Sequence, residues 1–335
     1  MVTTTRISKG IVSLGALIVG LTVGCQAGSR LDSTEKSAVE LALISGAAPM
    51  PASLVETKIF RDNDPSKPDR SLVPYDVRVA LWSDGAFKSR YIYLPPGSLL
   101  KLDSAKNPRY QSFNFPVGTT LVKHFSSAEQ GGIPVETRVM TLKENNKWSF
   151  ATYVWADDGT MTLNKRPRKV TRAGVEYRIP SEDECKMCHT AERPVLGFQA
   201  PQLDRETKSG TSQPEQLVRS RVIDKESLEG IAALRLDDPT NASLSVDKRT
   251  RAYMDVNCGT CHNPSGEVKA KKFDFRLETQ DTRLLAEKKV VPGKPDESIL
   301  WQIVTRDQNR MPYLSLRTDP LGAELIRSYI LQMPH

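Results

Sequence analysis

Cys185-Lys-Met-Cys-His189 and Cys258-Gly-Thr-Cys-His262 are two copies of one five-residue pattern, and they organise the second half of the chain. Each copy places two thiols three positions apart and an imidazole directly after the second thiol. Together they use four of the five cysteines and two of the four histidines among 335 residues. The fold therefore has to present two separate Cys/His sites.

C-x-x-C-H is the pattern at which haem c is attached to a polypeptide. The two thiols form thioethers with the haem vinyl groups, and the adjacent imidazole is thereby held as the proximal iron ligand. The sequence predicts two covalently bound haem c groups. Their attachment residues are Cys185, Cys188 and His189 for the first haem and Cys258, Cys261 and His262 for the second, with His189 and His262 as iron ligands.

Two other cysteine chemistries also use C-x-x-C pairs. A four-cysteine zinc site normally holds its pairs about 15 to 20 residues apart, whereas roughly 70 residues intervene here. A thioredoxin-like redox protein would use the pairs as disulfides, with a strand before the motif. Neither alternative explains why a histidine follows both pairs, so haem attachment is the preferred interpretation.

The N-terminal segment is typical of an export signal. Arg6 and Lys9 precede the apolar run 11–20, with no acidic residue in the first 24. Val23-Gly-Cys25 then resembles the lipobox of bacterial lipoproteins, in which the cysteine becomes the lipidated first residue. Thr22 departs from that pattern, because such signals usually carry Leu there.

We expect residues 1–24 to be a lipoprotein-type signal peptide, Cys25 to be lipidated, and residues 25–55 to be a polar tether. The alternative is ordinary cleavage nearby, which leaves Cys25 as a free thiol. Gln26, directly after the cysteine, resembles signals for the outer membrane. The expected location is the periplasm, with a lipid anchor in the outer membrane.

Composition and charge narrow the classes of partner. The chain is 39% apolar and 26% charged, as is ordinary for a soluble globular protein. Its formal net charge is +7, but no basic stripe with interleaved aromatic residues appears, so nucleic acid is not an expected partner. No later stretch approaches the roughly 20 apolar residues of a spanning helix. We expect redox proteins as partners, and membrane contact only through the N-terminal lipid.

Residues 56–180 form an expected β-rich domain. Short runs rich in β-branched and aromatic residues alternate with Gly, Pro, Asn and Asp, which predicts an antiparallel sandwich or meander. The expected strands are Arg90–Leu94, Tyr110–Phe115, Thr120–Phe125, Val135–Leu142, Trp148–Trp155 and Val175–Ile179.

Two further segments carry the motifs. Residues 181–245 hold the first motif in an irregular and helical region, with 214–236 as the expected helix. Residues 246–335 hold the second motif between an expected helix at 246–257 and a terminal helix that begins with Asp319 and Pro320. The predicted fold class is α+β: an N-terminal antiparallel β domain followed by a mainly α-helical di-haem cytochrome c region.

The order helix, C-x-x-C-H, loop, Met-Pro turn and terminal amphipathic helix resembles a small class I cytochrome c domain. In that family the methionine before the proline is the distal iron ligand, which implies this role for Met311. The alternative is a methionine that only fills core space. From 55 to 335, motifs such as Leu81-Trp-Ser-Asp-Gly-Ala and Tyr253-Met-Asp-Val-Asn-Cys resemble an uncharacterised family of exported bacterial di-haem c-type cytochromes.

The distal ligand of the first haem is left open, because no histidine or methionine lies between 190 and 250. His124, on a predicted strand, is the candidate named first, and the alternative is an ordinary surface or buried strand histidine. Met161 and Met140 are weaker candidates. A vacant or water-bound position is a further alternative.

Two functions remain open from the sequence. The favoured one is a di-haem c-type cytochrome that carries electrons between a dehydrogenase and another redox carrier, since modules related to the resembling family occur fused to quinoprotein sugar dehydrogenases. The alternative is a di-haem enzyme such as a peroxidase, in which an open first haem performs the chemistry. Trp82, Asp84 and Arg138 are polar or aromatic residues that could line such a pocket, but the preferred interpretation is that they support the β fold.

Overall fold

The computed structural model describes residue 1 and residues 49–334, except 104–108, 111–112, 191–192, 265, 267–272, 280–284, 286 and 288. The expected lipidation site at Cys25, the signal peptide and most of the tether lie outside the described residues. Within the described part, no helix has the length and apolar character needed to cross a membrane.

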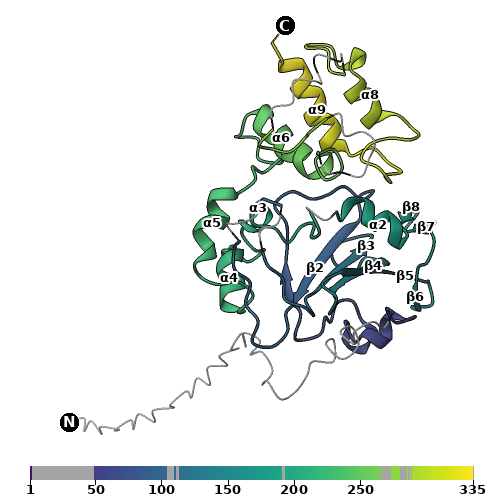
Figure 1. Ribbon diagram of the computed structural model, residues 1–335, viewed down its shortest axis with the longest axis vertical. Coiled ribbons are helices and arrows are strands. Elements are labelled where there is room, and N and C mark those ends of the chain that lie inside the picture. The colour runs from purple at the N-terminus through teal and green to yellow at the C-terminus, as the bar shows by residue number, and fades with distance from the viewer. Residues whose placement is uncertain are drawn as a thin grey trace.

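A six-stranded antiparallel meander forms the centre of the molecule, with each strand paired to the next in the order β1 to β6 (Figure 1). A separate two-stranded ribbon, β7–β8, follows it. The strands are β1 (Val73–Tyr75), β2 (Phe87–Tyr93), β3 (Thr120–Ser126), β4 (Pro134–Leu142), β5 (Trp148–Trp155), β6 (Met161–Leu163), β7 (Arg168–Arg172) and β8 (Val175–Ile179).

The long alternating runs form strands where the sequence predicts them, since β3, β4, β5 and β8 fall on expected strands. The strand expected over 110–115 is wrong. In the described part of that segment, Phe113 makes only a single bridge, to Leu102.

The two faces of the sheet bury different residues, because successive side chains of a strand point to opposite faces. On one face, Val122, Val139 and Tyr153 pack with two N-terminal residues: Leu54, in the turn η1 (Leu54–Thr57), and Phe60, directly before the turn η2 (Arg61–Asn63). The other face carries a second apolar cluster, whose strand members are Ile92, Leu121 and Met140. The chain after the sheet covers this second face.

That covering segment contains four short helices: α2 (Glu182–Cys188), α3 (Ala200–Leu203), α4 (Gln213–Arg219) and α5 (Ser227–Leu234). The single helix expected over 214–236 is wrong, because α4 ends at Arg219 and Arg221 adopts a left-handed φ of 54°. Leu217 on α4 and Ile231 on α5 are fully buried and pack in the apolar cluster on this face of the sheet.

The C-terminal part is a small helical layer that lies above the sheet in Figure 1. Its described elements are α6 (Val246–Asn257), the turn η3 (Pro295–Glu297), α8 (Ile299–Thr305) and α9 (Pro320–Gln332). Asp319 caps α9 by accepting a hydrogen bond from the Leu321 amide, as the sequence predicts. Gly322 lets α9 approach α6 closely, because a side chain there would collide with Tyr253.

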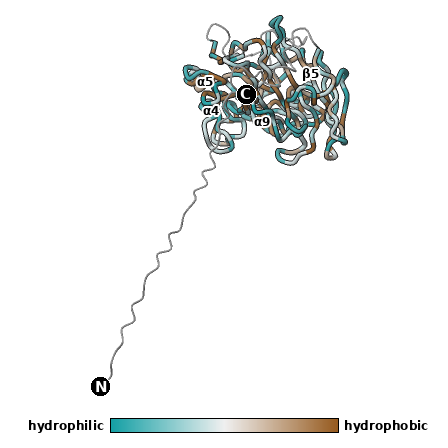
Figure 2. Tube along the Cα trace, turned by 90° about the horizontal axis from the view of Figure 1, so that it is seen from below, coloured by the Kyte–Doolittle hydropathy of each residue, from teal (hydrophilic) through white to brown (hydrophobic). Residues whose placement is uncertain are grey.

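The predicted fold class is wrong in its second half. Helical content is only 26% and the helices lie mostly in the C-terminal part, so the described residues do not form a mainly α-helical di-haem region. The first motif is instead part of a largely irregular segment that packs on the β-sheet. Hydrophobic and hydrophilic residues are interspersed along the trace (Figure 2), as expected where each short element buries one side.

Candidate functional site

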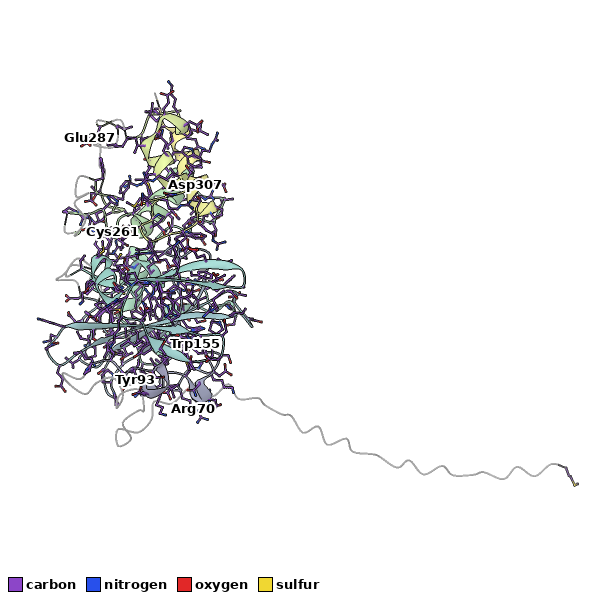
Figure 3. All side chains as sticks on the ribbon, turned by 90° about the vertical axis from the view of Figure 1, so that its right-hand side faces the viewer. Arg70, Tyr93, Trp155, Cys261, Glu287 and Asp307 are labelled. Atoms are coloured by element: carbon purple, nitrogen blue, oxygen red, sulfur yellow. The ribbon has the colours of Figure 1, made fainter. Side chains whose placement is uncertain are left out.

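The two C-x-x-C-H motifs meet at the boundary between the sheet and the C-terminal helices, where Cys261 lies in Figure 3. The Cys188 and Cys261 sulfurs are 3.6 Å apart, although 73 positions separate them in the chain. A disulfide needs about 2.05 Å between its sulfurs. The four cysteines of the motifs are all free thiols, so each is available for another bond.

The first motif is positioned by the end of β8 and by a capped helix. Ser181 and Glu184 form a capping box at the start of α2, with each side chain bonded to the other residue's amide. Arg178 on β8 also donates to the Glu184 carboxylate at 2.7 Å. These contacts fix α2 against the sheet, with Cys185 and Cys188 in its last turn.

His189 is held with one specific ring nitrogen free. Its Nδ1 lies 2.8 Å from the carbonyl oxygen of Pro194. A carbonyl only accepts, so Nδ1 carries the proton and Nε2 keeps its lone pair. Burial lowers the pKa of His189 to about 3, which keeps the imidazole neutral. A backbone carbonyl behind Nδ1 is the usual support of a metal-binding histidine, so the residues present fit an iron ligand here.

The second motif directly follows α6, with Cys258 as the C-cap of that helix. The His262 ring packs edge-on against Phe275, with centroids 5.5 Å apart. Cys258, Phe275 and Met311 all pack against one apolar cluster of the C-terminal helices. The structure therefore brings Met311 and the second motif to the same cluster, and the role of Met311 as an iron ligand stays a prediction.

A cavity lies between the first motif, the sheet and the loop after Met311. Its wall includes Cys185, Cys188 and His189 of the first motif, Cys261 of the second motif, and the segment Pro312–Ser315. The sheet contributes Lys123 on β3 and Arg138 on β4. The two motifs and the Met-Pro loop thus share one space.

Three basic side chains form a row across the sheet beside this cavity. Arg90, Lys123 and Arg138 are direct cross-strand partners on β2, β3 and β4. Arg90 is paired with Asp76, and Arg138 with Glu136. Among the described residues, none gives the ammonium group of Lys123 a hydrogen bond or an ion pair. Burial and the two neighbouring guanidinium groups lower the pKa of Lys123 to about 7.

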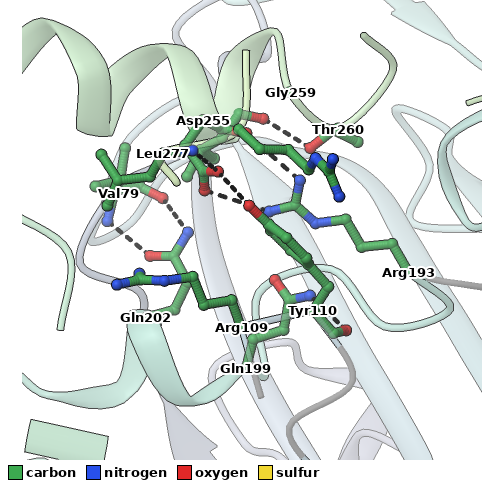
Figure 4. A network of polar contacts seen from close by, with 12 residues as sticks. Val79, Arg109, Tyr110, Arg193, Gln199, Gln202, Asp255, Gly259, Thr260 and Leu277 are labelled. Carbon is green, nitrogen blue, oxygen red and sulfur yellow. Dashed lines mark hydrogen bonds and ion pairs between the residues drawn. The ribbon is translucent and has the colours of Figure 1, made fainter. Parts of the chain in front are cut away.

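A buried polar network ties the two motif regions together (Figure 4). Asp255, on α6, accepts hydrogen bonds at Oδ1 from the Tyr110 hydroxyl at 2.9 Å and from the Leu277 amide at 3.0 Å. Its Oδ2 lies 3.4 Å from Nη2 of Arg193, which follows the first motif. The guanidinium of Arg193 also stacks over the Tyr110 ring at 4.3 Å.

Trp82 and Asp84 line the cavity and anchor the loop that follows Met311. Asp84 accepts hydrogen bonds at 2.8 Å from the backbone amides of Leu316 and Arg317. The Trp82 indole donates to the Arg317 carbonyl at 3.0 Å. Arg138, the third residue named for a pocket from the sequence, also lines this cavity.

His124 is not brought together with the first motif. It lies on the opposite face of the sheet, where its Nδ1 is 2.9 Å from the Thr137 hydroxyl and its ring packs edge-on against Phe60 and Trp155. Met161 belongs to that same far-side cluster. Of the methionines considered for the first haem, Met140 lines the cavity.

Sequence reasoning missed Lys123, Pro194 and Asn257. Asn257 joins α6 to the β domain through its side-chain bonds to the Ala80 carbonyl and the Trp82 amide. Only Lys123 had a usable signal, because lysine is depleted in β-strands. The contacts of Pro194 and Asn257 depend on tertiary packing.

A helix leading into C-x-x-C-H, a Met-Pro loop and a terminal helix around one apolar cluster define a cytochrome c-like region. Residues 258–312 match the family described as Planctomycete cytochrome C, from the first cysteine of the second motif to the proline after Met311. This region implies covalently bound haem c and indicates a haem electron-transfer role. Neither the curated proteins nor the solved structures gave a significant match to the chain.

Proposed function

We propose that this protein is an exported di-haem c-type cytochrome that carries electrons between a dehydrogenase and another redox carrier. The observation that carries the proposal is the 3.6 Å separation of the Cys188 and Cys261 sulfurs. Because thioethers form at these sulfurs, haems attached at both motifs would have neighbouring edges. An electron would then cross from one haem to the other in a short step.

The haem iron, when bound, supplies reversible one-electron chemistry, and the chain sets its binding and potential. Neutral His189 offers Nε2 while Pro194 holds its other nitrogen. Met311 is proposed as the second ligand at the His262 haem, and the apolar cluster around it limits access of water. Since a thioether ligand raises the potential of a haem, the two haems are expected to differ in potential.

The proposed division of the chain follows this function. Residues 56–180 would be the supporting β domain, 181–245 would carry the first haem and 246–335 the second. Residues 1–24 would be the signal peptide and 25–55 the tether, whose last part, at Met50 and Leu54, packs against the β domain. Acylated Cys25 would hold the protein at the outer membrane, facing redox partners in the periplasm. Mass spectrometry of the mature N-terminus tests this, and an unmodified thiol at Cys25 would refute the anchor.

Carbon monoxide separates the carrier from the peroxidase-type alternative. A carrier gains from two strong axial ligands on each iron, because little then moves when the oxidation state changes. We therefore expect the ferrous protein to be fully low-spin and to bind carbon monoxide slowly or not at all. Rapid carbon monoxide binding together with rapid peroxide turnover would replace the carrier by the enzyme.

A further inference from the structure

The structure limits which side chains can reach the open iron position of the first haem. His124 faces the other side of the sheet, so the candidate ligands among the described residues are those on the cavity wall beside His189. Donor side chains on that wall include a lysine, a methionine, two tyrosines and three carboxylates: Lys123, Met140, Tyr177, Tyr313, Asp84, Glu136 and Glu184.

The carboxylates on the wall are already engaged. Asp84 holds the backbone of the loop after Met311. Glu136 is bonded to the Arg138 guanidinium, and Glu184 caps α2 while pairing with Arg178. Using any of them as an iron ligand would break the contact that positions the cavity.

The tyrosines and the methionine fit the role less well than the lysine. A tyrosine binds iron as the phenolate, whereas burial raises the pKa of Tyr177 and so retains its proton. Tyr313 is 51% exposed and has no neighbour that fixes it toward the cavity among the described contacts. Met140 belongs to the apolar cluster on the cavity side of the sheet, where its side chain already fills core space.

Lys123 is the exception among these donors, because its position is unfavourable without a ligand. Like charges directly opposite on neighbouring strands destabilise a sheet, and Lys123 has an arginine on both sides. Each arginine has its own carboxylate partner, and Lys123 has none among the described residues. A local arrangement that costs stability without compensation is a mark of a functional position.

We propose that Nζ of Lys123 is the distal iron ligand of the haem attached at Cys185 and Cys188, opposite His189. This inference rests on the proposed function, because it requires a haem at the first motif. Lys123 would hold the iron through the lone pair of its neutral Nζ, after the ammonium group had given its proton to the solvent, and the haem would supply the redox chemistry. The side chain is then no longer an unpaired cation between two arginines.

Lys123→Ala and Lys123→Arg test the ligand role against a role of charge alone. Arginine keeps the positive charge, but its guanidinium stays protonated and does not offer a lone pair. We expect both variants to retain two covalent haems, with one haem converted to a high-spin form that binds carbon monoxide rapidly. Added imidazole should return that haem to the low-spin form.

Lys88→Ala is the matched control. Lys88 lies on the same face of the sheet, but its ammonium group donates to the Leu81 carbonyl and sits 5.7 Å from the Phe125 ring centroid. This variant should keep both haems low-spin, and Met140→Leu should do the same. Two results would overturn the proposal. One is a fully low-spin spectrum in Lys123→Arg. The other is a high-spin first haem in Met140→Leu together with a low-spin first haem in Lys123→Ala.

The haem count keeps this test separate from that of the proposed function. A wild-type protein with two haems and an unchanged low-spin spectrum in both Lys123 variants contradicts the ligand alone. A wild-type protein with a single haem at Cys258 and Cys261 contradicts the di-haem function, and the ligand proposal falls with it.

Discussion

Asp255→Asn should destabilise the protein and weaken the connection between its two motifs. Asp255 lies three positions before Cys258, and Arg193 lies four positions after His189. The side chains of this pair are 5% and 7% exposed. In the Asp255→Asn variant the remaining carbonyl oxygen can still accept from Tyr110 and Leu277, while an amide group faces Arg193. The substitution therefore removes the ion pair and leaves the two other hydrogen bonds in place.

Removing one partner of a buried ion pair costs about 3–5 kcal/mol, because the other charge remains buried without compensation. Asp255→Ala also deletes the hydrogen bonds from Tyr110 and Leu277, worth about 1 kcal/mol each. We expect a free energy of unfolding lower by about 3 kcal/mol or more in the Asn variant, and lower by about 2 kcal/mol more in the Ala variant. At roughly 2–4 °C per kcal/mol, the Asn variant should melt about 6–12 °C lower.

Urea unfolding of the haem-loaded variants measures these differences, and flash reduction measures electron exchange between the haems. Asp62→Asn is the matched control, since Asp62 pairs with Lys67 at 3.3 Å on the surface, where an ion pair is worth about 1 kcal/mol or less. The exchange rate should fall in the Asp255 variants and stay constant in the control. A loss below about 1 kcal/mol for Asp255→Asn would show that this pair is solvated, and the reasoning would be refuted.

Two other predictions address the ligands. Met311→Ala should abolish the near-infrared sulfur-to-iron charge-transfer band and lower one of the two potentials. Met333→Ala alters the same apolar cluster and should keep the band. An unchanged band in Met311→Ala would mean that another residue is the ligand. For Lys123, burial and the neighbouring guanidinium groups lower the folded pKa to about 7, below the ordinary 10.5, and a bond to iron would also keep the amine neutral. Between these values the unfolded chain binds a proton that the folded chain does not, so the free energy of unfolding should rise with pH across this window. Lys123→Met should remove that rise, which urea titrations at several pH values measure. An identical pH dependence in the variant would contradict the lowered folded pKa of Lys123.

Local signals in the sequence located those elements that depend on near neighbours. The cap at Asp319, with Pro320 at the first turn, was enough to place α9, and the run into Cys258 was enough for α6. The helix expected over 214–236 failed because the chain turns at Arg221 to place Leu217 and Ile231 on the sheet, and this depends on tertiary packing.

The candidate site also combines features that local sequence predicts with features that depend on tertiary packing. The motifs are readable because their spacing is local, but their meeting is set by distant contacts such as that of Asn257 with Ala80. Strand β3 is buried on both faces, so its pattern does not say which face receives the first motif. Sequence reasoning chose His124, and the structure turns its neighbour Lys123 toward the cavity. A difference of one residue in a strand selects the opposite face.

The intact mass of the mature protein under denaturing conditions tests the central claim most directly, because thioether-linked haem stays on the chain when the fold is lost. The wild-type protein should retain two haems that acid acetone does not extract. Cys185→Ala combined with Cys188→Ala should retain one. A wild-type mass with a single haem, or two retained haems in the double variant, would contradict the account.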